Sequence, residues 1–148
     1  MTSAPSPHPS DWRIGVWRSF LRMHATVLRS LEHELAAAGM PLPWYDVLLQ
    51  LAEAPQHRLR MAELADRVLL SRSGVTRLVD RLETEGYVTR ERSTDDARGT
   101  FTVLTRLGRA ALRAAAPVHL AGIQRHWLSR YSDDDLRVLR ELLQRPEP

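Results

Sequence analysis

Apolar side chains along this chain recur mostly at three- and four-residue steps, the spacing that places them on one face of an α-helix. The longest such stretch runs from Asp11 to Gly39, and its apolar face is wider than one packing partner requires. Shorter helical patterns follow over residues 43–54, 60–67, 71–85, 106–130 and 133–145. The pattern predicts a mainly α fold with six helices, the fifth kinked rather than broken at Pro117.

One segment departs from the helical period. Residues 87–92 and 100–104 are rich in β-branched and aromatic side chains and flank a polar tip. They predict a small β-hairpin that carries Arg98 at its tip. Residues 55–58 predict a break between the second and third helices.

Composition narrows the function classes. The chain has 148 residues, 43% of them hydrophobic, which suits one domain with a core of its own. Cysteine is absent, which excludes disulfides, thiolate metal sites and a cysteine redox switch. All 21 basic residues are arginine, and the net charge of +3 hints at an anionic partner.

No apolar run approaches the roughly 20 residues of a membrane helix, so we expect a soluble, cytoplasmic protein without a membrane partner. The Pro/Ser-rich residues 1–10 are expected to form a disordered arm.

The third and fourth predicted helices have the spacing of a helix-turn-helix. On the fourth helix, small side chains at Ser73 and Thr76 would let the backbone approach a DNA major groove. Arg77 and Arg81 could reach guanine edges or phosphates with a two-pronged guanidinium. The alternative is a solvated helix face on which Asp80 pairs with its two arginine neighbours.

The hairpin favours the DNA interpretation because it follows the helix pair directly. Arg90 and Arg92 alternate along its first strand and therefore share one side. Such a wing can place Arg98 in a narrow minor groove while the strand arginines contact phosphate.

These segments resemble the MarR family of winged helix-turn-helix transcriptional regulators. Asp96, Ala97 and Arg98, then five residues, then Leu104 and Thr105 fit the D-x-R-x5-L-T signature of that family. The segments 60–65, 71–82, 85–88 and 105–109 look like its helix-turn-helix, exit turn and fifth helix, and the similarity covers residues 11–145.

The resemblance implies a homodimer bound to double-stranded DNA at a pseudo-palindromic operator. It implies a single domain over 11–148, with dimerisation helices at 11–40 and 106–148 and a DNA-binding lobe at 43–105. The DNA-contacting positions carried over are Ser71, Ser73, Thr76, Arg77, Arg81 and, in the wing, Arg98. Two departures from the family pattern stand out: Ala97 replaces a second wing arginine, and Arg60 with Met61 replaces the Ser/Thr cap of the third helix.

Family members commonly respond to small aromatic or phenolic acids, which implies a repressor released by such an effector. The side chains that could line its cleft are Trp17, Phe20, His24, Trp44, Val47 and His119. Aromatic rings with a few polar groups suit a ligand of this kind, although Trp17 and Trp44 also fall on core-facing stripes. Two alternatives stay open: ligand-independent DNA binding, and a winged-helix dimer that binds other proteins.

The sequence shows no residue pattern typical of a catalytic site or of a metal site. His119 and His126 are seven residues apart, whereas two helical zinc ligands need a spacing of four. There is no nucleophile–base pair, glycine-rich phosphate loop or carboxylate dyad. We expect neither an enzyme nor a cofactor or metal ion.

Overall fold

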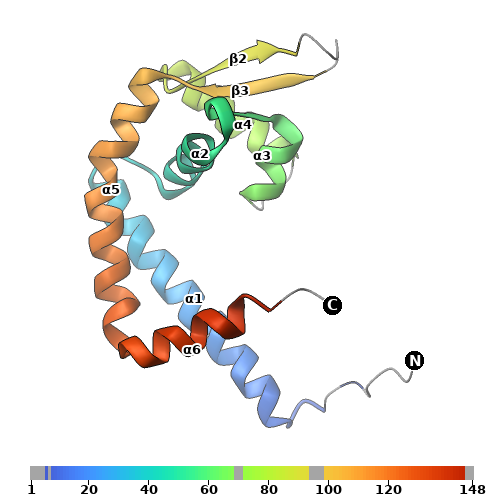
Figure 1. Cartoon of the computed structure of the whole chain (residues 1–148), viewed down its shortest axis with the longest axis vertical. Helices are drawn as coiled ribbons and strands as arrows, with labels where there is room; N and C mark the ends of the chain where they lie inside the picture. Colours follow the sequence, from blue (N-terminus) through green and yellow to red (C-terminus); the bar gives the residue numbers. More distant parts are fainter. Residues whose placement is uncertain (1–5, 7, 69–71, 94–98, 146–148) are drawn as a thin grey trace. The chain divides into compact units, whose positions relative to one another are not determined.

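The computed structural model describes residues 6, 8–68, 72–93 and 99–145. Its six α-helices are α1 (Trp12–Ala37), α2 (Leu42–Glu53), α3 (Met61–Arg67), α4 (Arg72–Thr84), α5 (Arg106–His126) and α6 (Asp133–Leu143) (Figure 1). Three short strands join them, β1 (Arg58–Arg60), β2 (Val88–Arg92) and β3 (Thr100–Leu104), with single 3-10 turns at Pro55–His57 and Leu128–Arg130. The predicted fold class, mainly α with a small β wing, is confirmed.

The chain divides into two compact units. The first unit comprises Met1–Leu31 and Gly122–Pro148, and the second comprises Glu32–Ala121. Helices α1 and α5 each contribute to both units. The boundaries between the units fall inside these two long helices. The division into dimerisation helices and a DNA-binding lobe at 43–105 stays a prediction.

The second unit contains a three-stranded antiparallel sheet in the order β1-β3-β2. Strand β1 was not predicted: the sequence indicated only a hairpin, and β1 adds a third strand to it by pairing Arg60 with Phe101. The break before it is sharp, because Gln56 and His57 both have positive φ angles, 55° and 53°. A three-residue strand with one buried residue, Leu59, is too short to give an alternating pattern in the sequence.

The core of the second unit forms where the apolar faces of α2, α3 and α4 meet the sheet. Val47, Leu48 and Leu51 of α2 are fully buried, as are Val75, Val79 and Leu82 of α4. In α2 the prediction was only partly right, because Tyr45 is buried while its neighbour Trp44 is half-buried. Burial of this apolar surface is the main driving force for folding.

Several helix ends carry local sequence signals. Gly39 and Gly86 follow α1 and α4 with φ angles of 82° and 76°, a region that favours glycine. Ser132 caps α6 in a capping box with Asp135. At α1, however, the Asp11 carboxylate rather than Ser10 accepts from the Arg13 N–H, at 2.9 Å.

The fifth helix is shorter than predicted. It continues through Pro117 without a break but ends at His126 rather than at Arg130. Trp127 leaves helical geometry, with φ −128° and ψ −63°, and a 3-10 turn follows. Apolar residues on both sides of this corner give a continuous helical pattern, which is why the sequence did not reveal it.

A close backbone contact joins the start of α5 to the turn after α4. The Thr105 hydroxyl donates to the Gly86 carbonyl oxygen at 2.7 Å and accepts from the Gly108 N–H at 3.0 Å. A Cβ atom at Gly108 would overlap the Tyr87 carbonyl oxygen and lie 2.9 Å from Leu104 Cδ1. This position therefore excludes any side chain.

We expect Gly108→Ala to lower the free energy of unfolding by roughly 1–3 kcal/mol, because overpacking against a fixed backbone forces the two segments apart. Gly15→Ala is the matched control: it lies inside α1 with no atom within 4 Å of a Cβ, and alanine is favoured over glycine there by about 0.5–1 kcal/mol. Urea denaturation followed by circular dichroism measures both. Equal stability of the two variants would show that the Gly108 contact is not close in solution.

Candidate nucleic-acid interface

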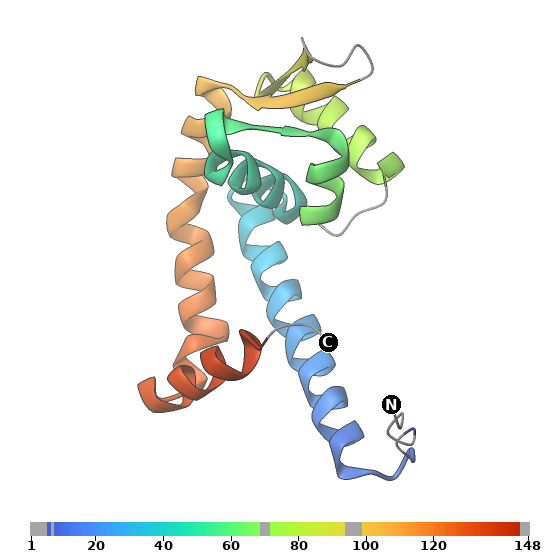
Figure 2. The same cartoon turned by 45° about the vertical axis from the view of Figure 1, so that its right-hand side comes forward.

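Helix α4 has the two faces that the sequence predicted. Val75, Val79 and Leu82 are buried, whereas Ser73, Thr76, Arg77 and Arg81 are exposed. The helix follows α3 and packs beside β2 (Figure 2). A helix with a polar outer face of small and basic side chains, held by a buried inner face, can enter a major groove.

The arginines of the exposed α4 face are not neutralised. Neither Arg77 nor Arg81 makes an ion pair with any residue that the structure describes. The intrahelical charge cluster considered from the sequence does not form, because Asp80 Oδ1 instead lies 2.6 Å from Nη2 of Arg90 on β2. Two guanidinium groups remain available to an anionic partner.

Arg90 differs from the other predicted contacts. It pairs with both Asp80 and Glu83 of α4, and its side chain is only 26% exposed. These two ion pairs connect strand β2 to α4. A phosphate contact by Arg90 stays a prediction, and it would have to compete with both carboxylates.

Arg92 meets the conditions for a phosphate contact better than Arg90 does. It is exposed, pairs in register with Thr100 at the closed end of the hairpin, and has no ion pair with a described residue. Just beyond it, the Ser93 N–H donates to the Gly99 carbonyl oxygen at 2.8 Å and closes the base of the wing. Two further predicted contacts, Ser71 and Arg98, lie outside the described residues.

Sequence reasoning missed two arginines on β1. The Cζ atoms of Arg58 and Arg60 lie 4.7 and 4.9 Å from the centroid of the Phe101 ring, within the range of cation–π attraction. The Arg-Leu-Arg alternation was the signal, since period two places both arginines on one side of a strand. Both guanidinium groups thus contact the ring, and Nη1 of Arg58 also lies 3.9 Å from Oε2 of Glu91.

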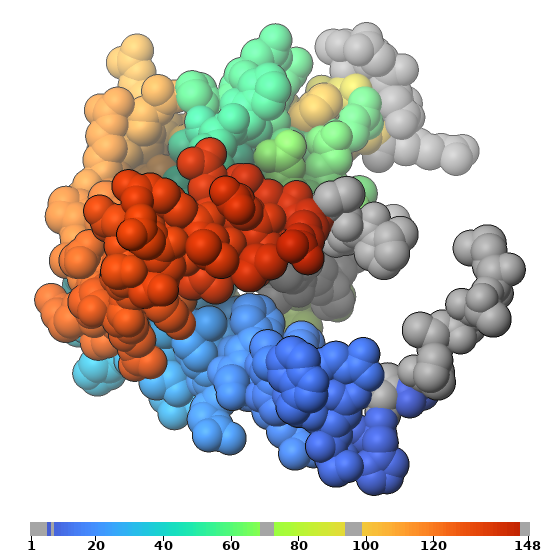
Figure 3. Space-filling model, turned by 60° about the horizontal axis from the view of Figure 1, so that its bottom comes forward, coloured from blue at the N-terminus to red at the C-terminus, as the bar shows by residue number. Residues whose placement is uncertain are grey.

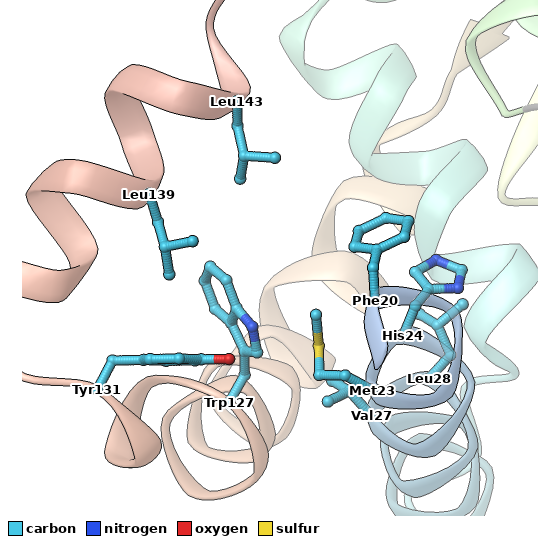
Figure 4. A pocket seen from close by; sticks show the side chains of 9 residues that line it. All are labelled: Phe20, Met23, His24, Val27, Leu28, Trp127, Tyr131, Leu139 and Leu143. Atoms are coloured by element: carbon cyan, nitrogen blue, oxygen red, sulfur yellow. The ribbon is translucent and has the colours of Figure 1, made fainter. Parts of the chain in front are cut away.

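The six predicted effector residues divide between the two units. Trp17, Phe20 and His24 belong to the first unit and stack along α1, with centroid distances of 5.8 and 6.0 Å. Phe20 and His24 line a cavity of about 290 Å³, and Trp17 does not. The other lining residues, drawn in Figure 4, are Met23, Val27, Leu28, Trp127, Tyr131, Leu139 and Leu143.

The remaining three candidates lie in the second unit. Val47 is fully buried in the core, so it does not line an open site. Trp44 packs edge-on against Tyr87, with centroids 6.2 Å apart, and His119 packs against Tyr45 at 4.3 Å. The effector role of all six stays a prediction.

His119 lies in an environment that disfavours its protonated form. Burial lowers the pKa of His119, and the nearby negative charge of Asp46 opposes this only in part. Burial likewise raises the pKa of Asp46, against the effects of a hydrogen bond with Gln50 and of the charge of His119. The buried Nδ1 atom of His119 has no hydrogen-bond partner among the described residues. The folded state therefore favours a neutral His119.

We expect His119 to make folding less favourable as the pH falls below about 6.5, the ordinary pKa of an unfolded histidine. Because its folded pKa is lowered, the unfolded chain binds more protons than the folded chain in that window, and stability falls with pH. Urea denaturation of the wild type and of His119→Gln between pH 7.5 and 5 measures the difference. The stability of the wild type relative to the variant should decrease toward pH 5. A pH-independent difference would mean that His119 titrates as it does in the unfolded chain.

Neither a metal site nor a membrane span is found in the described ranges. No three His, Asp or Glu side chains there gather closely enough to hold a metal ion. None of the helices there combines the length and apolar character needed to cross a bilayer.

The comparisons with known proteins agree with this geometry. A sequence profile of the MarR family matches residues 38–99. The chain is 32% identical over 119 residues to the HTH-type transcriptional repressor YetL of Bacillus subtilis, covering 78% of this chain and 71% of that protein. It is similar to AbsC of Streptomyces coelicolor, a MarR family transcriptional regulator, with a TM-score of 0.84, 31% identity and 94% coverage of both chains. It is also similar to Sco3205, a MarR family transcriptional regulator from the same organism that was solved in complex with DNA. The TM-score is 0.80 and the identity 37%, with 87% of this chain and 84% of that chain covered.

Proposed function

This chain belongs to the MarR family of transcriptional regulators, and we propose that it represses transcription by binding a pseudo-palindromic operator as a homodimer. Its relatives are transcriptional regulators and not enzymes, as the sequence predicted. The observation that carries the proposal is the exposed face of α4, where Arg77 and Arg81 have no counter-ion among the described residues. The related regulator Sco3205 was solved with DNA, which supports the same partner here.

In this proposal α4 is the recognition helix. Its small residues, Ser73 and Thr76, bring the helix axis close to the base edges, and Arg77 and Arg81 reach further along the groove. A bidentate arginine–guanine pair contributes sequence preference, whereas an arginine–phosphate pair contributes affinity on any sequence. Ser71 belongs to the same set of proposed contacts.

The wing provides the second proposed contact. Arg92 is assigned to phosphate, and Arg98 to the adjacent minor groove. Arg90 is assigned mainly a supporting role, because its ion pairs with Asp80 and Glu83 hold the wing strand beside the recognition helix. The relative position of the two DNA-contacting elements thus depends on charges inside the protein.

The proposed dimer interface lies on the first unit. Large apolar side chains are exposed there in unusual number, on α1 (Trp12, Val16, Trp17, Phe20, Leu21 and Leu28) and on α6 (Val138, Leu142 and Leu143). Helix α1, in blue, and α6, in red, present neighbouring surfaces in Figure 3, and residues from the middle of α1 and from α6 line the cavity of Figure 4. Contiguous exposed apolar surface of this kind marks an interface, and a second copy of the chain is the occupant assigned here.

Release by a small aromatic or phenolic ligand stays a prediction. Its support in this chain is limited to Phe20 and His24, which line the cavity of the first unit. A ligand can release DNA only to the extent that it binds the DNA-incompetent state more tightly.

The first test is the binding of the purified protein to DNA from upstream of its own gene, with scrambled DNA as the control. Arg77→Ala should weaken specific binding by about 1–3 kcal/mol and reduce the preference for the operator, if Arg77 reads a base. Fluorescence anisotropy at two salt concentrations measures both effects.

Arg113→Ala is the matched control, because it removes one exposed arginine of α5 in the same unit. It should leave binding nearly unchanged. Equal losses on operator and scrambled DNA with Arg77→Ala would assign Arg77 to phosphate instead. Weak wild-type binding that does not distinguish the two DNAs would favour the protein-interaction alternative and calls for a selection from genomic fragments.

The dimer is tested by Leu142→Glu, which buries two charges in a two-fold interface and should shift the protein toward the monomer. Sedimentation velocity distinguishes a 16.9 kDa chain from a dimer of twice that mass. The control is Ala62→Glu, an exposed position on α3, which should leave the dimer intact. A wild-type monomer at micromolar concentration would refute the proposed assembly.

A further inference from the structure

The side chain of Arg60, on β1, packs against the base of the wing, where Ser93 and Gly99 pair. Arg60, the last residue of β1, places its guanidinium against Gly99, the residue that precedes β3. A Cβ atom at Gly99 would overlap Nη1 of Arg60 and would lie 3.3 Å from its Cζ. Gly99 does not have a positive φ, so its lack of a side chain serves this close approach rather than an unusual backbone conformation.

The Arg60 side chain makes two further contacts with the other strands. Its Cζ lies 4.9 Å from the centroid of the Phe101 ring, on the residue directly across the β1–β3 ladder. Its Nη2 lies 3.5 Å from Oγ of Ser93, a buried residue at the end of β2. The guanidinium thus extends from β1 past β3 to the end of β2, beneath the point where the wing closes.

The backbone of the same residue starts the helix-turn-helix. Arg60 is the N-cap residue of α3, and its N–H donates to the Glu63 carboxylate at 3.0 Å. The main chain of Arg60 therefore belongs to the helix-turn-helix, and its side chain belongs to the wing. No other described residue contributes both to this cap and to the closed end of the hairpin.

We propose that Arg60 is a positioning residue for DNA binding: its guanidinium, held between Phe101 and Gly99, fixes the base of the wing relative to the helix-turn-helix. The inference rests on the proposed function, because it concerns how the wing is presented to DNA. It explains why an arginine occupies a position where a short capping side chain would suffice. The guanidinium acts here through its planar shape and its stacking on the ring, which lysine does not reproduce.

The test uses four variants of the full-length protein: Arg60→Lys, Arg60→Met, Gly99→Ala and the double variant Arg60→Met with Gly99→Ala. Each of the first three should weaken operator binding about 3- to 30-fold, the range that loss of a partly buried cation–π contact would produce. Gly99→Ala keeps every charge and displaces mainly the flexible end of Arg60, while the new methyl group also lies 3.2 Å from Cβ of Ser93. The double variant should bind no more weakly than Arg60→Met, because there is then no guanidinium for the new methyl group to displace.

Arg58→Met is the matched control. Arg58 lies on the same strand, at a similar distance from the Phe101 ring, and pairs with Glu91 rather than approaching Gly99. It should leave the wing in place. Hydroxyl-radical footprinting separates the two elements: the Arg60 and Gly99 variants should lose minor-groove protection at the wing site and retain major-groove protection by α4.

Two results would overturn the proposal. If Arg60→Lys binds like the wild type while Arg60→Met does not, Arg60 acts by its charge rather than by the shape of its guanidinium. If the effects of Arg60→Met and Gly99→Ala add in the double variant, the two residues act independently.

A measurement without DNA keeps this outcome separate from that of the proposed function. The Ser93 N–H, which donates to the Gly99 carbonyl oxygen, should exchange about 3- to 30-fold faster in Arg60→Met and Gly99→Ala than in Arg58→Met. If the wild type binds no DNA, the proposed function fails, and this exchange rate still decides whether Arg60 holds the wing. Unchanged exchange at Ser93 would refute the inference even where operator binding is normal.

Discussion

The arrangement of the second unit depends on one backbone-to-backbone contact. Thr105 bridges the Gly86 carbonyl oxygen and the Gly108 N–H, and Gly108 leaves no space between α5 and Tyr87. This junction ties the end of α4, the start of β2 and the start of α5 together at a single point. The strands of the wing leave from one side of it and return to the other, so the direction of the hairpin relative to α4 is set there.

Beyond that junction, contacts of arginine side chains connect the wing to its neighbouring elements. Arg90 bridges from β2 to two carboxylates of α4, and Arg60 packs its guanidinium beneath the closed end of the hairpin. Both are arginines, and a count of charges does not distinguish them from Arg77 or Arg81. What differs is the environment: the first two are engaged by acids or by an aromatic ring, and the last two face solvent without a described counter-ion. In the proposed function, Arg77 and Arg81 would contact DNA, and Arg90 and Arg60 would hold the wing beside them.

The first unit depends on a different balance. Its helices leave broad apolar surface on α1 and α6 exposed, and its only large buried side chain is Leu31 among the residues described there. A unit with so little core cannot bury enough apolar surface by itself to offset the entropy of ordering its chain. This is the physical argument for the proposed dimer, in which a second copy of the chain would supply the same apolar faces.

The sequence alone determined the elements whose cause is local. The helical period of the apolar residues predicted most helices, because this signal acts within one or two turns. The glycines after α1 and α4 and the capping box at Ser132 are equally local signals at helix ends. The wing and the helix-turn-helix were predictable because their residues follow one another along the chain.

Strand β1 exists only because β3 offers it hydrogen-bond partners some 40 positions later, at Arg58 and Val103 for example. Likewise, the roles of Arg90 and Arg60 depend on contacts with residues of other elements. The end of α5 was not predictable because the apolar pattern continues past Trp127, where helical geometry ends. Contacts between residues distant in sequence leave no periodic trace, and only the tertiary structure decided them.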